Sequence, residues 1–267
     1  MNLDLTNVRA KLARSQEHAQ AVKNEVQSWF DRHPYSVTKD TNADCTRYSL
    51  FLRVNEPPTL QRWTLIIGDC IHNLRCALDY LVYAVAVFEA KCEPPPFERA
   101  LAFPITDSRK DFEDAVARKS LGSISDPVIA VFESLQPYNR PHPTLPPLLK
   151  ILRSFNNADK HRLIKLVYGA VGSGEVGFSG NSPTGSTWTP FVNTGELQDG
   201  TEVHAMICDR PAPNMYFQDE LEIVLHICLW HGKRDPSGPH GSERTEFSAL
   251  LVGLVDEVRK IIYTFAK

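Results

Sequence analysis

Two clusters of polar residues, each embedded in an apolar helical pattern, hold the side chains most able to do chemistry. The first cluster runs from Gly68 to Tyr80 and reads Gly-Asp-Cys-Ile-His-Asn-Leu-Arg-Cys-Ala-Leu-Asp-Tyr. The second runs from Asn156 to Arg162 and reads Asn-Asn-Ala-Asp-Lys-His-Arg. Because ionisable groups are costly to bury unless they are paired, each cluster indicates either a functional site or a structural network of charges.

The spacing within the first cluster places three ionisable side chains on successive turns of one helix. His72 precedes Arg75 by three residues and Asp79 follows it by four, and side chains at these spacings are neighbours on a helix. A helical projection puts apolar residues on the other side, namely Ile71, Leu74, Leu78, Leu81, Val82 and Val85. We therefore predict a ladder of His72, Arg75 and Asp79 along the polar face.

The second cluster contains a carboxylate in an apolar setting. A projection places Asp159 on the face that also carries three apolar residues, Leu148, Leu152 and Phe155. A buried carboxylate without a partner would be neutralised rather than remain charged. The pattern therefore predicts that Asp159 pairs with Arg75 or His72 across the interface of the two helices.

Together the clusters resemble the motifs of a family of bacterial proteins. Gly-Asp-x-x-His-Asn-Leu-Arg-x-Ala-Leu-Asp spans Gly68 to Asp79, and Asn-Asn-x-Asp-Lys-His-Arg spans Asn156 to Arg162. Members commonly read Leu-Arg-Ser-Ala-Leu-Asp-His, with four residues between the arginine and the histidine. That arrangement is similar to the signature of the HEPN superfamily of helical ribonucleases and nucleotide-binding proteins.

The resemblance implies that an arginine and a histidine have different roles at a phosphate. Arg75 would stabilise negative charge on the scissile phosphate and a histidine would move a proton, commonly at a dimer interface. This chain has Tyr80 where that histidine would fall. A phenol with a pKa of ~10 is a poor general base at neutral pH, which weakens the case for metal-independent RNA cleavage. His72 or His161 could take over the proton transfer.

The leading hypothesis is a HEPN-like protein that binds nucleotide or RNA phosphate, with or without ribonuclease activity. The residues expected to act on the phosphate are Arg75, His72, Asp79 and His161. The residues expected to hold or orient it are Asn73, Asn157, Lys160 and Arg162. RNA or nucleotide and a second copy of the chain are the expected partners, and neither cofactor, metal nor membrane is expected.

Two alternatives stay open. The protein could be a noncatalytic oligomeric or binding protein whose polar clusters are structural. It could instead be a metal-dependent helical-bundle enzyme, in which Asp69 and His72 form an i, i+3 ligand pair completed by Asp79, Asp159 or His161. Against the metal site, Arg75 stands among the ligands and repeated Glu-x-x-His motifs are absent from the sequence.

Composition excludes some classes of protein. The 267 residues carry 29 Lys and Arg against 32 Asp and Glu, a formal charge of -3, so the whole molecule provides no field attracting nucleic acid or an acidic membrane. The chain opens without the basic and apolar regions of a secretory signal, which predicts a cytoplasmic location. The six cysteines include no Cys-x-x-Cys pair and indicate neither a disulfide framework nor a zinc knuckle.

Periodicity and proline positions predict an α+β fold. The expected helices cover residues 4–32, 59–90, 111–119, 126–135, 148–163 and 247–265. The expected strands cover 35–38, 48–54, 163–171, 187–192, 202–208 and 220–230, and the Gly- and Ser-rich stretch 172–185 is expected to be a loop.

These elements predict a single domain over residues 1–267. Its helical bundle, which includes both terminal helices, comprises 1–33, 59–163 and 242–267. An N-terminal β-hairpin occupies 35–54, and a small antiparallel sheet inserted before the last helix occupies 163–231.

Overall fold

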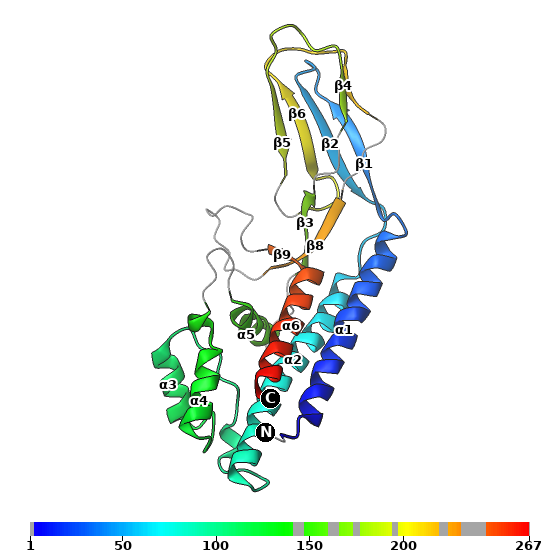
Figure 1. Cartoon of the computed structure of the whole chain (residues 1–267). Helices are drawn as coiled ribbons and strands as arrows, with labels where there is room; N and C mark the ends of the chain where they lie inside the picture. Colours follow the sequence, from blue (N-terminus) through cyan, green and yellow to red (C-terminus); the bar gives the residue numbers. More distant parts are fainter. Residues whose placement is uncertain are drawn as a thin grey trace. The chain divides into compact units, whose positions relative to one another are not determined.

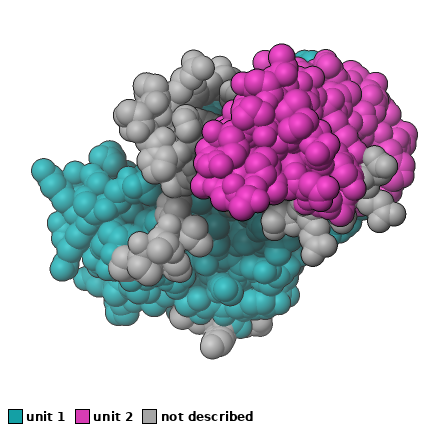
Figure 2. Space-filling model, turned by 90° about the horizontal axis from the view of Figure 1, so that it is seen from above, with its two compact units in different colours: residues 1–24, 61–164, 248–267 teal, residues 25–60, 165–247 magenta. Residues whose placement is uncertain are grey.

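The fold is described from a computed structural model of the chain (Figure 1). It describes residues 3–140, 147–159, 166–172, 177–193, 197–218, 224–230 and 244–266. The chain divides into two compact units (Figure 2). Unit 1 comprises Met1–Asn24, Gln61–Ile164 and Ser248–Lys267, and unit 2 comprises Glu25–Leu60 and Lys165–Phe247.

Unit 1 is helical. Its elements are α1 (Thr6–Phe30, which continues into unit 2), α2 (Leu60–Ala90), η1 (Glu98–Ala100), α3 (Arg109–Ala117), α4 (Asp126–Ser134), η2 (Pro137–Asn139), α5 (Leu148–Asp159) and α6 (Phe247–Phe265). Aromatic contacts join several of them: the Phe103 ring packs on Phe132 of α4 at 5.7 Å, and Phe132 packs on Phe265 of α6 at 4.6 Å.

Helix α2 is the central element of unit 1 because its apolar residues fill the core. The six apolar residues assigned to one face by the sequence pattern are all buried. Of the described helices, α2 alone is long and apolar enough to cross a membrane. A core helix passes the same test of length and composition, so this is weak evidence for a membrane protein.

Unit 2 contains three antiparallel sheets of strand order β1-β2-β6-β5, β3-β8-β9 and β4-β7. The strands are β1 (Tyr35–Thr41), β2 (Arg47–Val54), β3 (Leu166–Gly172), β4 (Phe178–Gly180), β5 (Trp188–Val192), β6 (Glu202–Cys208), β7 (Met215–Phe217), β8 (Val224–Trp230) and β9 (Arg244–Glu246). Tyr48, Phe178 and Trp188 form an aromatic cluster whose ring centroids lie 5.0–6.0 Å apart. This cluster ties the small β4-β7 sheet to the four-stranded one.

The predicted α+β class, the N-terminal hairpin and the sheet before the last helix are confirmed. Several details differ from the prediction, and the short strands β7 and β9 lie where no strand was predicted. The hairpin β1-β2 pairs with β6, so strands far apart in sequence share one sheet. Strand β4 lies inside the stretch predicted to be a loop, because its three residues pair with β7. The single domain stays a prediction, and the C-terminal end of the helix predicted over 148–163 lies outside the described residues.

Candidate functional site

Arg75 lies in a closed network of hydrogen bonds on the polar face of α2. Its Nε donates to Asp79 Oδ2 at 3.2 Å and its Nη2 to Asp79 Oδ1 at 2.7 Å. The same Nη2 donates to the backbone carbonyl of Phe103 at 2.7 Å. The backbone N–H of Phe103 donates to Asp79 Oδ1 at 2.8 Å. Arg75 and Asp79 of α2 thereby form hydrogen bonds with both the backbone carbonyl and the backbone N–H of Phe103, which follows η1.

The arginine pair is more shielded from solvent than other pairs at the same spacing. The side chains of Arg75 and Asp79 are 18% and 33% exposed, whereas those of Arg109 and Glu113 in α3 are 73% and 64% exposed. Shielded, bidentate pairs with further hydrogen bonds are the ones whose disruption is costly. The geometry of Arg75 therefore matches that of a structural clamp between α2 and Phe103.

His72 does not belong to this network, so the predicted three-residue ladder is wrong in that part. The side chain of His72 is exposed, and its Nε2 lies 3.4 Å from the Sγ of Cys76. The i, i+4 pair of Arg75 and Asp79 is as the spacing predicted. Arg75 has turned toward Asp79 and Phe103 because these offer it three hydrogen bonds.

The two polar clusters meet at Gly68. A Cβ atom at Gly68 would lie only 2.6 Å from Oδ1 of Asp159, so the missing side chain makes room for the carboxylate of α5. Burial and the charge of Asp69 raise the pKa of Asp159, and the charge of His72 acts in the opposite direction. The predicted pairing of Asp159 with Arg75 is wrong, since the guanidinium is bound to Asp79 and Phe103. Asp159 is near His72 without a hydrogen bond to it.

The other predicted site residues are divided between buried, exposed and undescribed positions. Asn73 is buried; its Nδ2 donates to the carbonyl of Asp69 at 2.8 Å, and its Oδ1 accepts from Lys11 Nζ at 3.5 Å. Asn157 is exposed on α5. Three further predicted residues, Lys160, His161 and Arg162, lie outside the described residues.

The basic side chains described on α5 are already paired with a carboxylate. Arg153 donates to Asp107 at 2.5 Å and to the carbonyl of Ile105 at 2.8 Å, and Lys150 lies 3.5 Å from Asp107. Burial of Asp107 opposes its ionisation, but the hydrogen bonds and charges of Arg153 and Lys150 outweigh this and lower its pKa. These cations therefore stabilise the fold locally and are not free for a phosphate.

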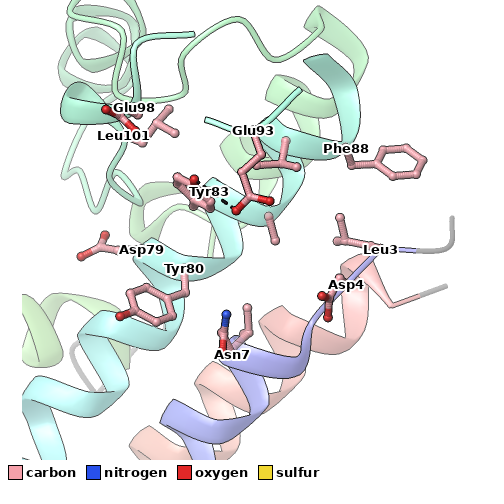
Figure 3. A pocket seen from close by; sticks show the side chains of 13 residues that line it. Leu3, Asp4, Asn7, Asp79, Tyr80, Tyr83, Phe88, Glu93, Glu98 and Leu101 are labelled. Atoms are coloured by element: carbon pink, nitrogen blue, oxygen red, sulfur yellow. Dashed lines mark hydrogen bonds between the residues drawn. The ribbon is translucent and has the colours of Figure 1, made fainter. Parts of the chain in front are cut away.

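A cavity of about 710 Å³ lies along the polar face of α2 (Figure 3), and Asp79, the partner of Arg75, is one of its lining residues. Its wall combines the N-terminal end of α1, α2 from Asp79 to Phe88, and the segment that follows α2. Tyr80 lines it and is 42% exposed, with Lys11 Nζ 5.7 Å from its ring centroid. Tyr83 reaches Glu93 at 3.5 Å. The sequence singled out Asp79 and Tyr80 of this wall, whereas the lining residues outside α2 were not predicted because they come from separate segments without a shared motif.

Among the described residues, no three or more His, Cys, Asp or Glu side chains are grouped so that they could hold a metal ion. Asp69, His72, Asp79 and Asp159 therefore do not form a metal site by themselves. His161, the remaining residue of that alternative, is not among the residues described.

Comparison with known proteins finds no match: no family model fits the chain, and no curated protein or solved structure is significantly similar to it.

Proposed function

We propose that this is a noncatalytic binding protein in which Arg75 and Asp79 are structural. The observation that carries the proposal is the set of four hydrogen bonds joining Arg75, Asp79 and Phe103. An arginine that stabilises a scissile phosphate must direct its donors at the phosphate, whereas the Nε and Nη2 groups of Arg75 are used within the protein. The histidine that would move the proton in the family-like motif is replaced here by Tyr80, and phenols are ordinarily poor general bases.

The charges around the clamp support the same proposal. The described ionisable neighbours of the two clusters include three carboxylates, Asp69, Asp79 and Asp159, and the guanidinium of Arg75 is matched by Asp79. Among the described residues of the two clusters, a phosphodiester meets more negative than unpaired positive charge. Phosphate sites instead gather unpaired Arg and Lys donors and backbone N–H groups.

An RNA-cleavage assay tests this proposal. Purified wild-type protein and the His72→Ala variant, which alters an exposed side chain, should both leave a labelled single-stranded RNA intact. Cleavage by the wild type that is lost in His72→Ala, with unfolding free energy unchanged, would overturn the noncatalytic reading. A matched control is Lys23→Ala, which alters an exposed residue of α1 away from both clusters.

The second candidate is HEPN-like binding of nucleotide or RNA phosphate by a homodimer. The specific observation in its favour is the contact of Gly68 with Asp159, which brings the two family-like motifs together. In this reading Asn157, Lys160 and Arg162 bind the phosphate and Arg75 keeps its structural role. Fluorescence anisotropy with labelled RNA tests it: Lys160→Ala and Arg162→Ala should weaken binding, and Lys23→Ala should not.

Two further properties belong to the same proposal. We propose a cytoplasmic location, as the pattern of the first residues predicts, and a homodimer, as the family resemblance implies. Light scattering on the purified full chain tests the dimer, because a monomer mass at micromolar concentration would exclude a stable one.

A further inference from the structure

The cavity beside the clamp has an unbalanced charge. Of its thirteen lining residues four are carboxylates and none is Lys, Arg or His. The carboxylates are Asp4, Asp79, Glu93 and Glu98. Asp79 is neutralised by Arg75, which leaves three negative charges without a cation in the described wall.

These three carboxylates have few partners inside the protein. Asp4 accepts hydrogen bonds from Thr6 alone among the described residues, from its backbone N–H at 2.9 Å and from its side chain, and both lower the pKa of Asp4. Glu93 meets only the Tyr83 hydroxyl, at 3.5 Å. The side chain of Glu98 has neither a hydrogen bond nor an ion pair with any described residue. Carboxylates are acceptors only, so the wall presents several vacant acceptor positions for N–H donors.

Apart from Asn7, the rest of the wall is aromatic and aliphatic. Tyr80, Tyr83 and Phe88 come from α2, and Leu3 and Leu101 come from the segments before α1 and after η1 (Figure 3). Val8 of α1 also lines the cavity. Aromatic faces attract cations, and Lys11 already lies over the Tyr80 ring. Burial raises the pKa of Tyr83, and the charges of Glu93 and Glu98 add to the effect, so their negative field reaches the centre of the wall.

From this combination we infer that the cavity binds a linear aliphatic amine carrying two or more protonated amino groups. The ammonium N–H groups donate to Glu93, Glu98 and Asp4, and the methylene chain packs on Tyr80 and Tyr83. A cavity of about 710 Å³ lies within the range of small-molecule sites. A phosphate or nucleotide would be repelled by the same carboxylates. The inference goes beyond the proposed function and does not depend on the role of Arg75.

Isothermal titration calorimetry of the full-length protein with spermidine at low ionic strength tests the inference. We expect saturable binding with a Kd of about 1 mM or tighter. The neutral chain 1,4-butanediol should not bind, because it offers no charge to the carboxylates. Added salt should weaken the binding of spermidine.

Matched variants locate the binding. Glu98→Gln and Glu93→Gln should each weaken it about fivefold, and Tyr80→Ala by about threefold. Glu17→Gln is the control, because this exposed glutamate of α1 pairs with Arg14 away from the cavity. Absence of saturation, or equal weakening by Glu17→Gln, would overturn the inference, the second outcome indicating diffuse attraction to surface carboxylates. Neither outcome bears on RNA cleavage, so the proposed function is tested separately.

Discussion

Gly68 and Asp79, near the two ends of the first cluster, lie about three turns apart on α2, and the carboxylates found there are in opposite environments. At the C-terminal end, Asp79 accepts hydrogen bonds from Arg75 and Phe103, and every member of the network has a partner. At the N-terminal end, Asp159 lies against Gly68 with Asp69 near it, and its pKa is raised. A carboxylate that is paired with hydrogen-bond donors stabilises a fold. A shielded carboxylate without such partners lowers stability, so it is retained for a reason other than stability.

This difference indicates that the two ends of the first cluster have different roles. Arg75, to which the family resemblance assigns a role in catalysis, lies at the end where the carboxylate is paired. Asp159 and the cavity carboxylates Asp4, Glu93 and Glu98 form no ion pair with a described residue. Ligands are therefore expected near the uncompensated carboxylates rather than at Arg75.

The largest expected effect is that of Arg75→Ala. It leaves the carboxylate of Asp79 and the carbonyl of Phe103 without their donor, so the free energy of unfolding should fall by about 2–3 kcal/mol. Urea denaturation followed by circular dichroism measures it. Arg109→Ala, which removes an exposed arginine at the same i, i+4 spacing, should cost less than about 0.5 kcal/mol. Equal costs for both variants would contradict the structural role assigned to Arg75.

A smaller effect is expected from Gly68→Ala. The added methyl group would lie 2.6 Å from the Asp159 carboxylate and force it aside, at a cost that exceeds the gain in helix propensity by about 1 kcal/mol. Gly253→Ala in α6 is the control, since its methyl group would meet Leu148 at 3.6 Å, an ordinary contact. That variant should be neutral or slightly stabilising in the same denaturation experiment. Stabilisation by Gly68→Ala would contradict the close contact.

The smallest effect concerns pH and Asp159. Because its pKa is raised in the folded protein, the charged carboxylate costs stability above that pKa, and the cost disappears as the pH falls toward the ordinary value of 3.8. Asp159→Asn should therefore stabilise the protein at neutral pH by less than about 1 kcal/mol. The gain should shrink by about pH 4 when unfolding is measured at both pH values. A loss of stability at neutral pH would indicate a cation partner for Asp159.

Much of the fold follows from the sequence because its signals are local. Apolar periodicity and prolines mark the helices, and α2 spans Leu60–Ala90 against a predicted 59–90. Strand β6 covers the predicted range because its β-type run is bounded by a Gly before it and Asp and Pro after it. The three-residue strands β4, β7 and β9 were missed because such short segments have no periodicity and exist through their partners.

The candidate site was less predictable because it depends on long-range contacts. The i, i+4 spacing correctly paired Arg75 with Asp79. Nothing in the sequence indicated that the backbone of Phe103 would complete the network, since it lies in another segment. Of the two partners predicted for Asp159, Arg75 was wrong and the charge of His72 does act on the carboxylate. A helical projection gives a direction and not the depth at which two helices meet, so it could not choose between them. Glu93 and Glu98 lie beyond the helix and carry no motif.

A double-mutant cycle on Arg75 and Asp79 tests the central claim most directly. The unfolding free energies of the wild type, Arg75→Ala, Asp79→Ala and the double variant give the coupling energy of the pair. The closed network predicts a coupling of about 1.5 kcal/mol or more, against less than about 0.5 kcal/mol for Arg109 and Glu113. A coupling near zero between Arg75 and Asp79, with both single variants fully folded, would contradict the structural role and return Arg75 to the candidates for ligand binding.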